Sequence, residues 1–67
     1  MLDQIAYQEK FENFIKMIAE SQENGIKIIV VANKNVLGDT DEEYQESLRR
    51  LNKAELKCHS TLEGELN

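Results

Sequence analysis

The feature that most constrains the fold is a run of β-branched residues at 26–32 (Ile-Lys-Ile-Ile-Val-Val-Ala). Branching at Cβ restricts χ1 in a helix and suits a pleated sheet, so this run favours a strand. Its apolar side chains fall on both faces, with Ile28, Val30 and Ala32 on one and Ile29 and Val31 on the other. We therefore predict a strand that is covered on both faces. The alternative is a short helix over 26–37, ended by Gly38, which would make the chain a three-helix bundle.

An amphipathic helix is predicted ahead of this strand, over residues 3–23. Its apolar side chains recur at the helical period and form one stripe, which consists of Tyr7, Phe11, Phe14, Ile15 and Ile18. Asn24 and Gly25 follow, and both tolerate the left-handed conformation that ends a helix. We expect the aromatic residues of the stripe in the core. The opposite face carries a few apolar residues that are either frayed or form a second small contact surface: Leu2, Ile5 and Ala6.

A second helix is predicted over residues 41–53. The sequence Thr40-Asp41-Glu42-Glu43 has the capping-box pattern, in which the Thr40 hydroxyl and the Glu43 carboxylate each accept from the other's backbone N–H. Acidic residues occupy the first turn and basic residues the last, which complements the helix dipole. The apolar stripe of this helix consists of Tyr44, Leu48, Leu51 and Ala54.

Beyond this helix the apolar period changes to two. Alternate positions are apolar or small, at Ala54, Leu56, Cys58, Ser60 and Leu62. Residues 55–62 are therefore predicted to form a second strand with one apolar face, and 63–67 a flexible tail. The whole chain, 1–67, is predicted to be one small α/β domain of order α-β-α-β with a two-stranded sheet. Its last three elements form a βαβ unit.

The size of the chain indicates that it needs a partner. A domain of 67 residues buries only about 60% of the surface that its unfolded chain exposes. One cysteine gives no disulfide, and one Cys with one His gives a poor set of zinc ligands. A two-stranded sheet also leaves both edges unpaired. We therefore expect a homo-oligomer, most simply a homodimer in which two copies pair edge to edge into a four-stranded sheet.

The sequence also bears on location. No stretch reaches 18 consecutive apolar residues, so we expect no membrane-spanning helix. The first ten residues lack the basic and apolar regions of a signal peptide, and a lone cysteine suits a reducing compartment. The expected location is the cytoplasm, or the host cytoplasm if the protein is viral.

One short segment resembles a nucleotide-binding motif. The strand at 28–32 followed by Asn33-Lys34 is similar to the guanine-reading Asn-Lys-x-Asp motif of small GTPases. Cys58-His59-Ser60 stands roughly where that family has a later base-contacting loop. The Asp of the motif is replaced by Val36, and the chain has no glycine-rich phosphate loop. We therefore do not predict GTP binding.

The candidate catalytic residues do not indicate an enzyme. Cys58 and His59 are adjacent on a predicted strand, so their side chains point to opposite faces and cannot form a nucleophile–base pair. Cys58 shares its face with Leu56 and is expected to be a small buried apolar residue. The carboxylates lie on solvated helix faces without the apolar surroundings that raise a pKa. We predict no catalytic residue, no metal site and no cofactor.

The charge of the chain is negative and uneven. Thirteen acidic against eight basic residues give a net charge of −5. Residues 39–67 carry eight acids and four bases, and the acids are densest at the start of the second helix, at Asp39, Asp41, Glu42, Glu43 and Glu46. We predict that these five residues contact a basic surface on a partner protein. The alternative is that they only cap the helix and keep the protein dispersed in water. Direct nucleic-acid binding is disfavoured by the same negative field.

Three classes of function remain. The first is a small acidic protein-binding module that inhibits or adapts another macromolecule, as many phage and mobile-element proteins do to host enzymes and defence proteins. The second is a small dimeric transcriptional regulator or antitoxin-type protein, for which the only basic cluster is Arg49, Arg50, Lys53 and Lys57. The third is an oligomer that sequesters a small ligand at a subunit interface. Charge, size and the absence of a recognition helix favour the first class.

Overall fold

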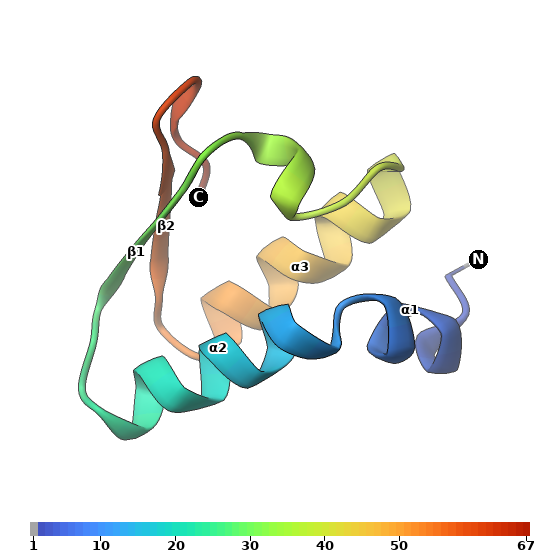
Figure 1. Ribbon diagram of the computed structural model, residues 1–67, viewed down its shortest axis with the longest axis horizontal. Coiled ribbons are helices and arrows are strands. Elements are labelled where there is room, and N and C mark those ends of the chain that lie inside the picture. The colour runs from blue at the N-terminus through green and yellow to red at the C-terminus, as the bar shows by residue number, and fades with distance from the viewer. Residues whose placement is uncertain (1) are drawn as a thin grey trace.

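The computed structural model describes residues 2–67, and the order of its helices and strands roughly fits the predicted α-β-α-β (Figure 1). The helices are α1 (Gln4–Lys10), α2 (Glu12–Glu23) and α3 (Asp41–Lys53), with a 3-10 turn η1 (Lys34–Val36) ahead of α3. The strands are β1 (Ile28–Val31), β2 (Lys57–Ser60) and β3 (Gly64–Glu65). The predicted α/β class is confirmed, and the three-helix bundle is not the fold.

The sheet is built on the predicted βαβ unit. Its strand order is β1-β2-β3. β1 and β2 are parallel, with Ile28 beside Lys57 and Val30 beside His59. The chain passes between them through η1 and α3 (Figure 1). Parallel pairing needs such a crossover, and β-branched residues supply the first of the two strands.

The segment at 63–67 differs from its prediction as a flexible tail. Gly64–Glu65 forms β3 and pairs antiparallel with β2, and the Leu66 N–H donates to the Cys58 carbonyl (2.9 Å). The side chain of Asn67 continues the pairing: its Oδ1 accepts from the Cys58 N–H (2.7 Å) and its Nδ2 donates to the Leu56 carbonyl (2.9 Å). Among residues 2–67 the sheet therefore has three strands instead of two. The period-two pattern missed β3 because a strand this short leaves almost no pattern to read.

The predicted first helix is divided at Phe11. The backbone there has φ −107° and ψ 28°, outside helical values, and separates α1 from α2. The predicted stripe still faces the core, since Tyr7 is 1% exposed and Phe11, Phe14 and Ile18 are 8% exposed. At the break the rings of Tyr7 and Phe11 stack, with their centroids 4.6 Å apart. The end of α2 at Glu23 is as predicted, with Gly25 at φ 72° just beyond it.

The prediction that β1 is covered on both faces is wrong. Ile29 is buried against the helices, whereas Ile28 and Val30 are 57% and 65% exposed. The core lies between the helices and this one face of the sheet, and includes Leu37, Leu51, Leu56 and Cys58. Within residues 2–67 no helix covers the other face, because α2 and α3 lie on the same side of the sheet (Figure 1).

Candidate functional site

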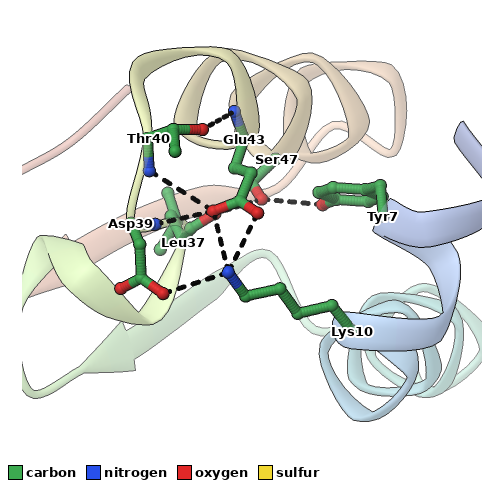
Figure 2. Close-up of polar contacts among 7 residues, drawn as sticks. All are labelled: Tyr7, Lys10, Leu37, Asp39, Thr40, Glu43 and Ser47. Carbon is green, nitrogen blue, oxygen red and sulfur yellow. Dashed lines mark hydrogen bonds and ion pairs between the residues drawn. The ribbon is translucent and has the colours of Figure 1, made fainter. Parts of the chain in front are cut away.

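The acidic segment begins with the predicted capping box. The Thr40 hydroxyl accepts from the Glu43 N–H (3.1 Å), and the Glu43 carboxylate accepts from the Asp39 and Thr40 N–H groups (2.9 and 3.3 Å) (Figure 2). Three backbone N–H groups at the start of α3 are thereby satisfied. Glu43 is therefore occupied by the fold, as its place in the motif predicts.

A lysine from α1 joins this cap. Lys10 Nζ lies 2.9 Å from Glu43 Oε2 and 3.1 Å from Asp39 Oδ2 (Figure 2). The Lys10 hydrogen bond is the main reason that the pKa of Glu43 is lowered, and Glu43 in turn raises the pKa of Lys10. The Glu43 side chain is only 13% exposed. Sequence reasoning missed Lys10 because it is 33 residues away from Glu43 and lies off the apolar stripe of its helix.

Glu46 differs most from its prediction as a partner-binding residue. It is buried, and two arginines one turn further along α3 cover it: Arg49 donates through Nε (3.0 Å) and Nη2 (2.6 Å), and Arg50 through Nε (2.9 Å). The hydrogen bonds from Arg49 are the largest cause that lowers the Glu46 pKa to about 2. Its charge is therefore compensated within the helix, and Glu46 is not a surface group.

The remaining acids of the segment are exposed. Asp39 retains 69% of its side-chain exposure beside Lys10, and Asp41 and Glu42 are exposed on the first turn of α3. A shallow depression of about 350 Å³ opens here between η1 and α3. Its lining includes Lys34 and Asn35 from η1, Asp39 and Asp41, and the half-buried Tyr44. The structure thus brings two predicted acids together at one depression and directs Glu43 and Glu46 elsewhere.

A buried hydrogen-bonded chain fixes the helices around this region. The Ser47 hydroxyl donates to the Leu37 carbonyl (2.6 Å), so the Tyr7 hydroxyl, 2.7 Å away, donates to Ser47 (Figure 2). All three residues are at most 1% exposed, and burial raises the pKa of Tyr7. These two hydrogen bonds join α1, the residue after η1 and α3 to one another. A serine on an amphipathic helix gives no sequence signal of such a role.

Three of the four residues of the predicted basic cluster lie beside acidic side chains of the same chain. Arg49 and Arg50 are bound to Glu46, and the Arg50 guanidinium lies 5.0 Å from the centroid of the Tyr7 ring. Lys57 lies on β2, 4.0 Å from a carboxylate oxygen of Glu65. The positive charges of both arginines are therefore partly neutralised by Glu46 on the same helix. This makes it less plausible that the cluster binds nucleic acid.

The residues singled out for chemistry lie apart. Cys58 is fully buried in the core, as predicted, and burial raises the pKa of its thiol. His59 points to the opposite face of β2, where it pairs in register with Val30 and Glu65. In the segment that resembles the GTPase motif, the Asn33 side chain accepts from the Asn35 N–H (2.9 Å) and caps η1.

Comparisons with known proteins give no assignment. No family model, no curated protein and no solved structure matches the chain. Among residues 2–67, no helix is long and apolar enough to cross a membrane.

Proposed function

We propose that this chain is a small acidic protein-binding module, an inhibitor or adaptor of another macromolecule, and that it contacts a basic surface through the start of α3. The observation that carries the proposal is the pair of exposed carboxylates, Asp39 and Asp41, at the rim of the depression beside Tyr44. Phage and mobile-element proteins that act on host enzymes or defence proteins are the class this fits.

The chemistry of the depression suits a basic side chain. Carboxylates form charge-assisted hydrogen bonds with arginine or lysine, and an aromatic ring offers a face to the same cation. The net charge of −5 adds a long-range attraction to a basic partner. Lys34 also lines the depression, and Lys10 Nζ lies 3.1 Å from Asp39 Oδ2, so both lysines oppose this attraction locally. We expect the acids mainly to raise the association rate, with a contribution that falls as salt is added.

The experiment begins with affinity capture of the partner from the native host and measures association by stopped flow at two salt concentrations. Asp39→Asn with Asp41→Asn removes the two carboxylates, and should slow association by about 3- to 10-fold at low salt and flatten its salt dependence. Glu20→Gln with Glu23→Gln is the matched control, because it makes the same charge change at exposed positions on α2.

The comparison of the two double variants decides the proposal. If they associate at equal rates, only the net charge matters and the start of α3 is not the contact. If the Asp39/Asp41 variant also melts at the wild-type temperature but associates more slowly than the control, the contact lies at the depression.

A further inference from the structure

The more open edge of the sheet belongs to β1. On the other side of the sheet, β3 has two residues and the Asn67 side chain extends its pairing with β2. β1 has four residues, lies at the end of the strand order and pairs only with β2 among residues 2–67. The two edges are therefore unequal, and β1 is the one that can take another strand.

The backbone of β1 shows which groups face this edge. The Lys27 carbonyl accepts from the Lys57 N–H of β2, and the Val31 carbonyl accepts from the N–H of Thr61, the residue after β2 (2.9 Å each). Backbone groups alternate in direction along a strand, so Ile28 and Val30 direct their N–H and C=O groups away from β2. Their side chains are also the exposed ones, and Ile26 just before them is 44% exposed. The open edge thus combines main-chain donors and acceptors with exposed apolar side chains.

Within β1 itself, the side chains that usually protect an edge strand are missing, although Lys27 directly precedes it. Natural edges carry proline, charged side chains or bulges that prevent pairing. This chain has no proline, and β1 reads Ile-Ile-Val-Val. An unprotected, apolar edge of this kind is a pairing site for another strand.

We propose that β1 pairs antiparallel with β1 of a second copy, about a two-fold axis at Ile29. Ile28 then lies opposite the partner's Val30, and these two positions exchange both hydrogen bonds, because their N–H and C=O groups are the ones that face the edge. Lys27 lies opposite the partner's Val31, so no like charges oppose each other across the strands. The dimer has a continuous six-stranded sheet of order β3-β2-β1-β1-β2-β3, instead of the four strands expected from the sequence.

A second copy fits this edge better than an arbitrary strand because the pairing is self-complementary. Every apolar side chain on the exposed face of β1 meets an apolar side chain of the partner, and the strand lengths match by symmetry. Each copy has a net charge of −5, so the copies repel at long range. The dimer therefore tightens as salt screens this repulsion, in contrast to the association with a basic partner proposed above.

Amide exchange tests the register directly. In the dimer the amides of Ile28 and Val30 become protected, so their exchange measured by NMR should slow as the protein concentration rises. The amides of Ile29 and Val31 face β2 in either state and should not respond to concentration. Protection that appears at other amides instead, or at none while the protein dimerises, overturns the proposed interface.

A pair of variants tests it by sedimentation equilibrium. Ile28→Lys with Val30→Lys places like charges opposite each other across the axis and should weaken the dimer at least tenfold. Ile5→Lys with Leu62→Lys is the control, because both side chains are exposed (72% and 75%) and the charge change is equal. Both double variants reduce the net negative charge of the chain equally, so the control also accounts for the weaker long-range repulsion between copies. The proposal is overturned if the wild type is a monomer at high micromolar concentration, in which case β1 could pair only with a strand of another protein. It is also overturned if the two double variants weaken the dimer equally.

Discussion

At the scale of single residues, the acidic segment divides by helix geometry. Glu43 stands at the third helical position, where a carboxylate reaches the cap, and Glu46 stands one turn further, where Arg49 and Arg50 reach it. Both acids therefore stabilise α3 from within. Asp39 and Asp41 stand before and at the start of the helix and remain exposed. Reading all five acids as one surface overlooked these local partners.

Glu46 should make stability depend on pH. Its pKa is lowered to about 2 in the folded chain against 4.5 for the free side chain. Its contribution is therefore complete above pH 4.5 and is lost as the pH falls toward 2. Urea unfolding should show that Glu46→Gln has a lower free energy of unfolding than the wild type at pH 6. Between pH 6 and pH 3 the free energy of unfolding should fall by about 2 kcal/mol less in this variant than in the wild type.

The control for this prediction is Glu20→Gln, which removes an exposed glutamate from α2. It should retain the wild-type loss of stability on acidification. If Glu46→Gln instead follows the wild type in parallel at every pH, the carboxylate is not held in its ionised form by the two arginines.

At the scale of elements, sequence patterns predicted what is local. The β-branched run predicted β1, and Thr40 with Glu43 predicted the start of α3, because each signal lies within a few residues of the structure that it specifies. The break at Phe11 was not predictable, since the apolar stripe continues through it at the helical period. The contacts of Lys10 with Glu43, and of Tyr7 with Ser47, join residues 33 and 40 positions apart and leave no mark on either helix.

The junction between η1 and α3 gives an element-scale prediction. A Cβ added at Gly38 would lie 2.6 Å from the Tyr44 backbone nitrogen, so the start of α3 would have to move. Gly38→Ala should cost roughly 1–3 kcal/mol by overpacking, whereas Thr40→Ala should cost about 1 kcal/mol through the lost cap. Thermal and urea unfolding of both variants measure the difference.

Two outcomes would contradict this account of the junction. An unchanged stability of Thr40→Ala would mean that the cap does not hold the start of α3. A Gly38→Ala variant as stable as wild type would mean that the close approach to Tyr44 relaxes at no cost, and that the junction is not tightly packed.

At the scale of the whole molecule, one face of the sheet carries the core and the other is open. The sequence predicted the class and order of the fold but placed β1 in a fully covered position. An apolar run shows that side chains avoid water but not what covers them, and the helices among residues 2–67 cover only one face of the sheet. Ile28 and Val30 are thus the apolar side chains of this run that a single copy of the chain leaves exposed.

The closing of the sheet at its far edge gives the last prediction. Asn67 joins β2 to α3, because its side chain contacts the backbone at Leu56 and Cys58 and its Nδ2 also donates to Asn52 Oδ1 (2.9 Å). Asn67→Ala leaves part-buried backbone groups without this partner and should cost roughly 1–3 kcal/mol. Asn52→Ala is the control, since it removes a single exposed contact and should cost less than about 1 kcal/mol. A flexible end of the chain would instead make both substitutions neutral in urea unfolding, and would leave β2 held on that side by β3 alone.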